Sequence, residues 1–332
     1  MTQVGEIFGI RSRGGLHLRQ ARLWLDAGAG LRLPPPPRTA VTFQAQHDGV
    51  RRPPARLLCS TTLAALLGTT RPPLAIPYGK PFQLGLQAIE LLPAGSSPGS
   101  AMLRTQVGDR TVLFAGAARL DTLPGATPLE WREADVVVVD AELAATALAN
   151  LDTLTQAVDR AVVEAANGRP VLWRVEQPTV ALAVLALVAG RVPVRLAPTL
   201  QQLWRRSVAA GVLLPLPGSV RRAVAKPRMA QGRASLWLWP VAGALPAELQ
   251  GLPTTLVAED VAPQAMTAAN AAQGLGFSRR ASGEAVDAIA LASGAVDVVA
   301  VGRGAAALAL RLQAHGLRCW QLQDPQLALR LA

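Results

Sequence analysis

The sequence predicts a mixed α/β protein in which a strand-rich core is divided by an α/β insertion. Between residues 16 and 115, short apolar runs alternate with turn residues, which is typical of consecutive strands. After Asp140, apolar runs of strand length alternate with longer stretches of helical period. Near the end of the chain, strand, helix and strand follow one another again. Strands on both flanks of an α/β segment indicate one core domain interrupted by another.

The first half contains most strands of the predicted core. They are expected at Leu16–Leu18, Leu23–Leu25, Val41–Phe43, Phe82–Leu86, Ile89–Pro93, Ala101–Gln106 and Thr111–Ala115. A helix is expected from Ser60 to Gly68, with Ser60 or Thr61 as its cap, because a hydroxyl at the start accepts a free helical amide. The run Val136–Val139 is apolar throughout and ends at Asp140, so we expect a strand that is buried on both faces.

The second half alternates between helices and strands. Helices are expected at Ala141–Asn167, Pro178–Ala189, Thr199–Ala209, Ala281–Ser293 and Ala305–His315. Strands are expected at Pro170–Trp173, Val192–Leu196, Leu236–Trp239, Thr254–Val257, Val296–Val301 and, as the last of the chain, Cys319–Leu322. The segment Pro215–Gln231, which is rich in Pro, Gly and charge, is expected to be a loop. We place the first part of the core at residues 1–150, the insertion at 151–270 and the rest of the core at 271–332.

The charge of the chain indicates either a polyanionic partner or a compositional bias. The formal net charge is +11, and nearly all basic residues are Arg, since Lys80 and Lys226 are the only lysines. Arg carries a planar fork of donors that suits phosphate, and strong positive charge favours association with a phosphate backbone. A GC-rich genome produces a similar excess of Arg, so both interpretations stay open at this point.

The cysteines and the hydropathy indicate a reducing, aqueous compartment. Cys59 and Cys319 lie in separate apolar runs, which predicts two buried free thiols rather than a zinc site. The segment Met1–Ile10 lacks the basic start and apolar run of a signal peptide. The longest apolar run, Val180–Gly190, is too short to cross a bilayer. We therefore expect a cytoplasmic protein without membrane contact.

Several short segments carry a more specific pattern, and their order along the chain is part of it. They are Leu23-Trp24-Leu25-Asp26, Gln44-Ala45-Gln46-His47-Asp48-Gly49, Pro93-Ala94-Gly95-Ser96, Leu113-Phe114-Ala115-Gly116-Ala117, Val136–Asp140, Ser278-Arg279-Arg280-Ala281-Ser282 and Gly302-Arg303-Gly304. Together they resemble the metallo-β-lactamase fold as it occurs in bacterial β-CASP exonucleases, including DNA-ligase-associated ones, and in their RNA 3′-end-processing relatives. The resemblance implies an αββα sandwich, two mixed sheets with helices outside, interrupted by an inserted α/β β-CASP domain.

The same resemblance identifies which family residues are replaced. Of the family's His-x-His-x-Asp-His only the Asp is kept, as Asp48. The His of Pro-Ala-Gly-His is Ser96, and the metal-bridging Asp is Ala117. The first β-CASP acid is kept as Asp140, whereas two late histidine motifs carry Arg. The vestigial motif positions are Gln44, Gln46, Asp48, Gly49, Ser96, Ala117, Asp140, Arg280 and Arg303.

These replacements remove the chemistry of metal-dependent hydrolysis. A two-metal site needs His nitrogens and carboxylates, whereas Gln offers a neutral amide and Ala or Gly offers no ligand. A guanidinium at Arg280 or Arg303 repels a metal, and it can hold a phosphate or pair with Asp48 or Asp140 instead. We expect no metal, no cofactor and no catalytic residue in this chain.

A basic stretch without acids lies inside the expected insertion. No Asp or Glu stands between Glu176 and Glu248, a window that holds nine Arg or Lys residues and three Trp residues. Phosphate contacts from Arg with occasional aromatic stacking hold single-stranded DNA or RNA. The alternative is a solvated loop next to Trp residues of the core. The expected nucleic-acid-binding residues are Arg195, Arg205, Arg206, Arg221, Arg222, Lys226, Arg228 and Arg233.

Three functions remain open on the sequence. The first is a metal-free pseudo-nuclease of the β-CASP type, which binds nucleic acid, an active nuclease partner or both in DNA repair or RNA processing. The resemblance implies the pairing of active and inactive subunits, so a heterodimer with an active paralogue is expected, with a homodimer as the alternative. The second function is an active exonuclease or phosphodiesterase with an atypical metal site. The third is a purely structural subunit.

Overall fold

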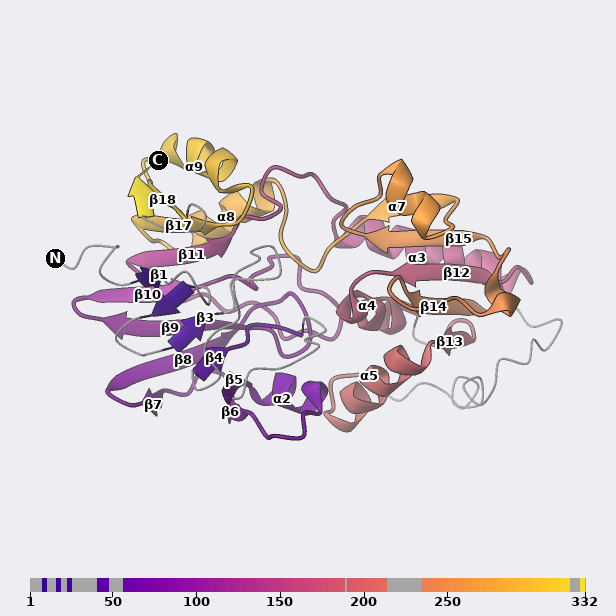
Figure 1. Ribbon diagram of the computed structural model, residues 1–332, viewed down its shortest axis with the longest axis horizontal. Coiled ribbons are helices and arrows are strands. Elements are labelled where there is room, and N and C mark those ends of the chain that lie inside the picture. Colours follow the sequence, from indigo (N-terminus) through magenta and orange to yellow (C-terminus); the bar gives the residue numbers. More distant parts are fainter. Residues whose placement is uncertain are drawn as a thin grey trace. The chain divides into compact units, whose positions relative to one another are not determined.

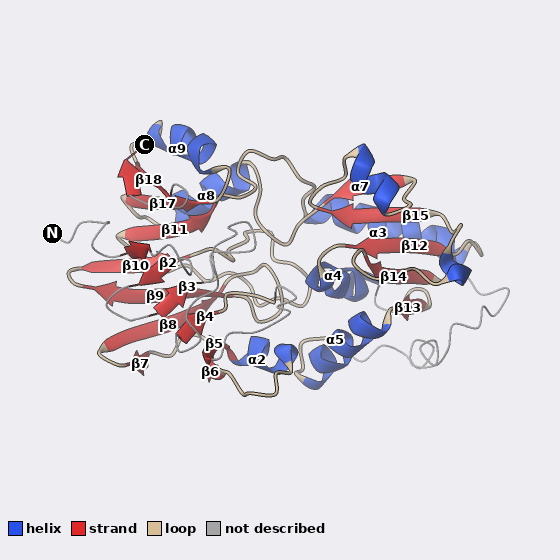
Figure 2. Cartoon of the chain, in the orientation of Figure 1, coloured by secondary structure: helices blue, strands red, loops and turns tan. Residues whose placement is uncertain are grey.

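The computed structural model describes residues 8–10, 16–18, 23–25, 41–47, 56–188, 190–213, 235–322 and 329–331. The chain forms two compact units, whose helices and strands are drawn in Figures 1 and 2. Unit 1 consists of Met1–Thr122, Ala126–Ala147 and Arg280–Ala332, and unit 2 consists of Leu123–Gly125 and Leu148–Arg279. Unit 2 is therefore inserted into unit 1 along the chain.

The first sheet of unit 1 has the strand order β1-β2-β3-β4-β5-β6. Its strands are β1 Phe8–Ile10, β2 Leu16–Leu18, β3 Leu23–Leu25, β4 Val41–Phe43, β5 Arg56–Ser60 and β6 Leu74–Ile76. The first three strands run antiparallel, and the strands from β3 to β6 run parallel. Three of the predicted strands, β2, β3 and β4, are found with the expected bounds.

The second sheet of unit 1 has the order β19-β18-β17-β11-β10-β9-β8-β7. Its strands are β7 Phe82–Leu84, β8 Gln87–Pro93, β9 Ala101–Val107, β10 Arg110–Phe114, β11 Val136–Asp140, β17 Asp297–Val301, β18 Arg318–Leu322 and β19 Leu329–Leu331. The strands β10, β11, β17 and β18 are parallel to one another. The carboxyl ends of these central strands therefore lie along one edge of the sheet.

The two sheets of unit 1 share one buried core, and helices pack on both sheets. Apolar side chains of both sheets form one buried core, in which the rings of Phe43 on β4 and Phe114 on β10 meet edge to face at 5.9 Å. Helix α2 (Thr61–Leu67) covers the first sheet through Leu63, which packs on Leu57 and Cys59. Helices α8 (Glu284–Ala292) and α9 (Ala305–Gln313) cover the second sheet.

Unit 2 is built around a parallel sheet with the order β13-β14-β12-β15-β16. Its strands are β12 Val171–Val175, β13 Val194–Leu196, β14 Leu236–Pro240, β15 Thr254–Ala258 and β16 Gln273–Gly276. Helices α3 (Leu151–Ala166), α4 (Pro178–Val188) and α5 (Pro198–Ala209) contact one another in that order on one face. The short η1 (Ala247–Leu249) and α7 (Pro263–Ala268) pack on the other face.

The predicted mixed α/β class is confirmed, and some predicted elements are corrected. The helix expected from Ala141 is wrong in its first part, because α3 begins only at Leu151, after the capping residue Asn150. The residues before it are held in turns, since the Ala141 amide donates to the Val301 carbonyl at 2.7 Å. The strand β18 is not the last, because β19 pairs with it. The loop expected at 215–231 lies outside the described residues.

The junctions between the units lie at 147/148 and 279/280, compared with expected domain ends at 150 and 270. The second junction lies later because β16 joins the sheet of unit 2, and the residues after β16 remain bonded to that unit. The prediction of buried free thiols is confirmed for Cys59 and Cys319, and burial raises the pKa of Cys59 to about 12. None of the described helices is both long and apolar enough to span a bilayer.

Candidate functional site

Seven of the nine vestigial motif positions lie in the described part of unit 1, whereas Asp48 and Gly49 lie outside it. Six of the seven lie at or just after the carboxyl ends of the strands β4, β8, β10, β11 and β17. The seventh, Arg280, is the first residue of the last segment of unit 1. Segments separated by more than two hundred residues therefore supply this edge of the unit. Their contacts form two groups.

The first group consists of Gln44, Gln46 and Ser96. All three are buried, with 4%, 1% and 0% of their surface exposed. The Gln44 Nε2 donates to the main-chain oxygen of Gln46 at 2.9 Å, and the Ser96 Oγ donates to Oε1 of Gln46 at 3.3 Å. The polar atoms of these three side chains are thus engaged with one another and with the main chain of their own group.

Main-chain hydrogen bonds bring the neighbouring segments to this group. The Ala101 amide donates to the Ala45 carbonyl at 2.7 Å, and the Arg119 amide donates to the Ala94 carbonyl at 2.8 Å. Gly95 has a φ of +78°, and a Cβ there would lie 2.4 Å from the Arg119 carbonyl oxygen. This close approach requires glycine. Ala117 lies buried in the same core and offers only a methyl group.

The second group begins with Asp140, the last residue of β11. Its Oδ1 accepts the Glu142 amide at 2.9 Å, and its Oδ2 lies 3.6 Å from Nη1 of Arg280. The side chains of Asp140 and Arg280 are each only 8% exposed. Arg119 supports the pair by donating from Nη1 to the Arg280 carbonyl at 3.3 Å. Pairing of Arg280 with Asp140 was one of the alternatives that the sequence left open, and it is present in the structure, whereas Asp48 lies outside the described residues.

Glu142 completes this group, and the sequence reasoning missed it. Its carboxylate accepts the Arg303 amide at 3.0 Å and also the Arg303 Nε. The Glu142 side chain is 3% exposed, whereas that of Arg303 is 84% exposed. Burial alone would raise the pKa of Glu142, but the hydrogen bonds from Arg303 and the charges of Arg303 and Arg280 hold it below its ordinary value. An acid just after the end of a central strand was the available signal.

A small pocket lies beside Asp140 and Arg280. Its other walls are small or apolar side chains and glycine, contributed by Ala115, Gly116, Ala118, Val139, Ala281, Val286 and Ile289. Water centres have about 10 Å³ available in it, which is room for about one water molecule.

These residues do not fit the two-metal site that the family resemblance implies. The Gln44 and Gln46 amides bond within their own group, and Ala117 has no donor atom. Each carboxylate of the second group already faces a guanidinium. Throughout the described residues, no three His, Cys, Asp or Glu side chains converge as they would around a metal ion.

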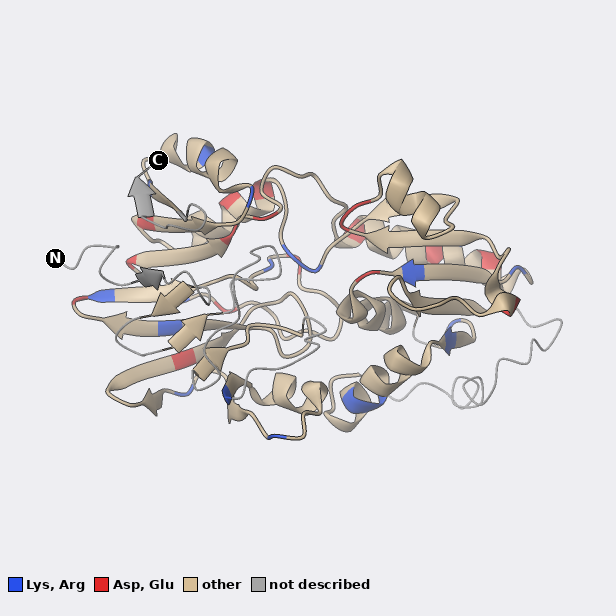
Figure 3. Ribbon diagram, viewed as in Figure 1, with Lys and Arg blue, Asp and Glu red and all other residues tan. Residues whose placement is uncertain are grey.

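The expected nucleic-acid-binding residues are only partly described. Arg195 lies on the edge strand β13, and its guanidinium carbon is 5.0 Å from the ring centroid of Trp237 on β14. Arg205 and Arg206 lie near the end of α5, on the opposite face of the sheet, and basic segments are visible on β13 and α5 in Figure 3. Outside the described residues lie Arg221, Arg222, Lys226, Arg228 and Arg233. The described Arg residues therefore do not form one patch.

Unit 2 also contains a polar group at the carboxyl ends of its strands, which the sequence did not indicate. The Gln177 Nε2 and the Ser278 Oγ both donate to Oε1 of Glu259, each at 2.5 Å. The Arg279 amide donates to Oε1 of Gln177 at 2.9 Å. These bonds tie the ends of β12, β15 and β16 together, which is a structural role.

Comparisons with known proteins bear on the fold alone. No protein-family model matches the chain, and no curated protein matches its sequence. Among solved structures, the chain is similar to a protein of unknown function from Enterococcus faecalis V583, with a TM-score of 0.56 and 12% sequence identity. The similarity covers 92% of this chain and 83% of that one. At this identity the two proteins share an arrangement of elements, and nothing follows about activity.

Proposed function

We propose that this chain is a metal-free relative of the β-CASP nucleases that binds single-stranded nucleic acid without cleaving it. In this proposal unit 1 is the metallo-β-lactamase sandwich and unit 2 is the inserted β-CASP domain. One observation carries it. Six of the seven described motif positions, scattered between Gln44 and Arg303, gather at one edge of unit 1 in two bonded groups, and the seventh, Ala117, is buried in the core of the same unit. This gathering of positions that the family pattern selects supports the proposal.

The chemistry of the gathered residues supports the absence of hydrolysis. Two-metal hydrolysis uses bound cations to acidify a water and to neutralise the developing charge. Here Asp140 and Glu142 face Arg280 and Arg303, which are permanent cations that cannot take a water as a ligand. The local negative charge is already compensated, so little electrostatic attraction remains for a divalent ion.

A partner follows from the same resemblance. We propose pairing with an active paralogue, with a homodimer as the alternative, and a place in DNA repair or RNA processing in the cytoplasm. The mass of the protein in solution, alone and with nuclease candidates from its own genome, tests this part.

The first experiment restores metal ligands. The twofold variant Gln46→His/Ser96→His places two imidazoles where the polar side-chain atoms lie 3.3 Å apart. The fourfold variant also carries Gln44→His and Ala117→Asp. We expect stoichiometric Zn²⁺ in the fourfold variant and none in the wild type, as measured by elemental analysis of purified protein. The matched control is Gln83→His/Gln106→His, which places two imidazoles on exposed strand positions. Circular dichroism establishes that each variant is folded.

Two outcomes contradict the proposal. Stoichiometric Zn²⁺ or Mn²⁺ in the wild type would favour an active exonuclease or phosphodiesterase with an atypical site. A folded fourfold variant that binds no more Zn²⁺ than the control would remove the support for a degenerate metal site.

The second experiment measures binding and cleavage on the same oligonucleotides. We expect single-stranded DNA or RNA to bind with an affinity that falls steeply with salt, and to remain uncut with Mg²⁺, Mn²⁺ or Zn²⁺. Cleavage that is lost in Asp140→Asn would support the active alternative. Absence of binding even at low salt would support a purely structural subunit.

A further inference from the structure

Arg195 is the basic residue of unit 2 whose surroundings are most specific. It is the middle residue of the edge strand β13, and it is aligned with Trp237 on the neighbouring strand β14. Its side chain is partly exposed, and its guanidinium lies over the Trp237 ring at 5.0 Å. Among the described strands, β13 ends the sheet on this side.

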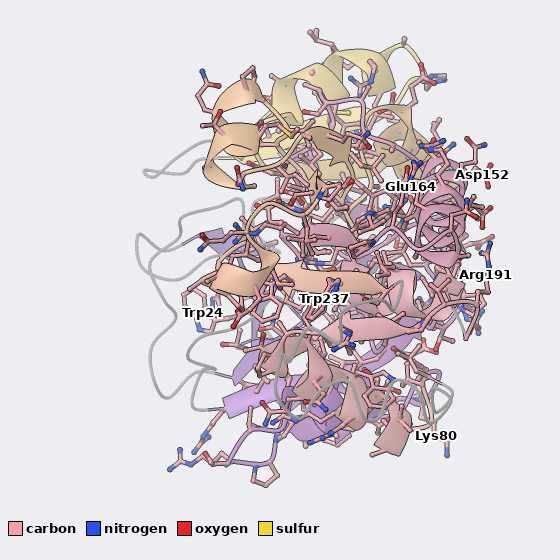
Figure 4. The ribbon with its side chains drawn as sticks, turned by 90° about the vertical axis from the view of Figure 1, so that its right-hand side faces the viewer. Trp24, Lys80, Asp152, Glu164, Arg191 and Trp237 are labelled. Atoms are coloured by element: carbon pink, nitrogen blue, oxygen red, sulfur yellow. The ribbon has the colours of Figure 1, made fainter. Side chains whose placement is uncertain are left out.

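Trp237 acts as a fixed support rather than as a stacking surface for a base. It is only 6% exposed and packs against Leu172 and Leu249. Figure 4 shows it among the side chains of the sheet, whereas Asp152, Glu164 and Arg191 project from the side of the unit. A guanidinium held over an indole ring loses less freedom on binding, because the ring already restricts it.

Among the described residues, no acceptor engages the side-chain donors of Arg195. Its guanidinium forms no hydrogen bond or ion pair with any residue that the structure describes, and its described contact is with the Trp237 ring. The undescribed segment 214–234 contains no Asp or Glu that could pair with it. The guanidinium of Arg174, on the same face of the sheet, is by contrast engaged in hydrogen bonds. It donates to the carbonyls of Ala269, Pro240, Val241 and Gly243.

We propose that Arg195 binds a backbone phosphate of single-stranded nucleic acid through its planar fork, with Trp237 holding the guanidinium in place. This rests on the proposed function. A phosphate oxygen pair matches the fork in a bidentate manner, which an ammonium cannot reproduce. The surrounding sequence, with nine basic residues and no acid between Glu176 and Glu248, adds long-range attraction for the same strand.

The test is a salt series on three proteins that differ at one position: wild type, Arg195→Lys and Arg195→Gln. Binding of oligothymidylate and oligouridylate of about 20 nucleotides is followed by fluorescence anisotropy. Each phosphate contact to a single strand contributes about 0.7 to the slope of log affinity against log salt. We expect Arg195→Gln to lower this slope by about 0.7 and the low-salt affinity by about tenfold. Arg195→Lys should keep the slope and lose part of the affinity, because the charge stays and the fork is lost.

The matched control is Arg169→Gln, which removes an exposed charge of unit 2 whose side chain forms no hydrogen bond or ion pair with a described residue. It should bind as the wild type does. Wild-type binding that is unchanged in Arg195→Gln would overturn the inference and leave the proposed function standing. A wild type that binds neither oligonucleotide at low salt overturns both. Unlabelled polyglutamate is used as a competitor. If it competes as well as unlabelled oligonucleotide, and only when Arg195 is present, the ligand of Arg195 would be an acidic protein segment rather than a phosphate.

Discussion

Asp297 lies at the start of β17 with none of its surface exposed. Its carboxylate accepts Nη2 of Arg110 at 2.5 Å, Nη2 of Arg318 at 2.8 Å and the Trp320 Nε1 at 2.9 Å. Burial alone would raise the pKa of Asp297, but these hydrogen bonds and the charge of Arg110 outweigh burial and hold the pKa below its usual value. A buried charge of this kind is tolerated only because every partner is present.

This network predicts how stability depends on pH. The pKa of Asp297 in the folded protein lies below its unfolded value of about 3.9. The ionised carboxylate therefore stabilises the folded state fully above the unfolded pKa. This stabilisation is lost as the pH falls through the folded pKa. Urea unfolding between about pH 7 and pH 3 should show this loss, and Asp297→Asn should reduce the slope. At neutral pH that variant should lose about 3–5 kcal/mol. Asp152→Asn, on the exposed face of α3, is the control, and an equal slope in the two variants would contradict the assignment.

Gly302 gives a prediction for the edge of unit 1. Its φ is +121°, and a Cβ would lie 2.6 Å from the Glu142 amide nitrogen. Gly302→Ala should therefore lower the free energy of unfolding by about 3 kcal/mol or more, since strain and a clash add together. In Gly294→Ala, the φ is also positive at +67° but no atom lies within 4 Å. That control should lose only about 1 kcal/mol, and equal losses would mean that the close approach to Glu142 is unimportant.

Among the elements, β12 is held to its neighbours by a buried cation. Arg174 is 7% exposed, and its guanidinium donates to the carbonyl of Pro240 at the end of β14, to two carbonyls of the turn that follows and to the Ala269 carbonyl at the end of α7. Burial lowers the pKa of Arg174. The carbonyl oxygens at the end of a helix carry partial negative charge, which makes them suitable partners for a guanidinium.

Replacing this cation tests its role as a link between elements. Arg174→Met should lower the free energy of unfolding by about 2–4 kcal/mol, because buried carbonyls lose their donor. Hydrogen exchange should rise first in residues 240–243 and in α7. Arg191→Met, which breaks an exposed ion pair with Asp159, should cost less than about 1 kcal/mol. A loss in Arg174→Met no larger than in Arg191→Met would show that the link is dispensable.

The elements themselves were largely predictable, and the failures have local causes. Period-two and continuous apolar runs predicted β2 to β4 of the first sheet and β7 to β11, β17 and β18 of the second, because burial on one or both faces leaves that pattern in the chain. The strands β1, β5, β6 and β19 were not predicted. The start of α3 was missed because the preceding residues have helical composition but bond elsewhere, through Asp140 and Val301. The strand β16 was missed because its sequence, Gln273–Gly276, contains two glycines and one large apolar residue.

At the scale of the whole molecule, the proposed absence of metal predicts indifference to chelators. A bound structural metal raises the melting temperature by several degrees, since ligands that bind only the folded state stabilise it. Dialysis against EDTA should therefore shift the melting temperature of the wild type by less than about 1 °C. The fourfold variant with restored ligands serves as the positive control. A fall of several degrees in the wild type would contradict the proposal.

Residue types alone limited the chemistry of this protein, because a donor atom that a side chain lacks cannot be supplied by folding. The sequence has Gln, Ser and Ala where the family that it resembles has His and Asp. Which charges compensate one another could be decided only in three dimensions. Asp140 and Arg280 are far apart in the chain, and the partner of Arg303 is Glu142, which no motif indicated. Pairing depends on distances of a few ångströms between strand ends, and such distances arise from sheet order and packing rather than from spacing along the chain.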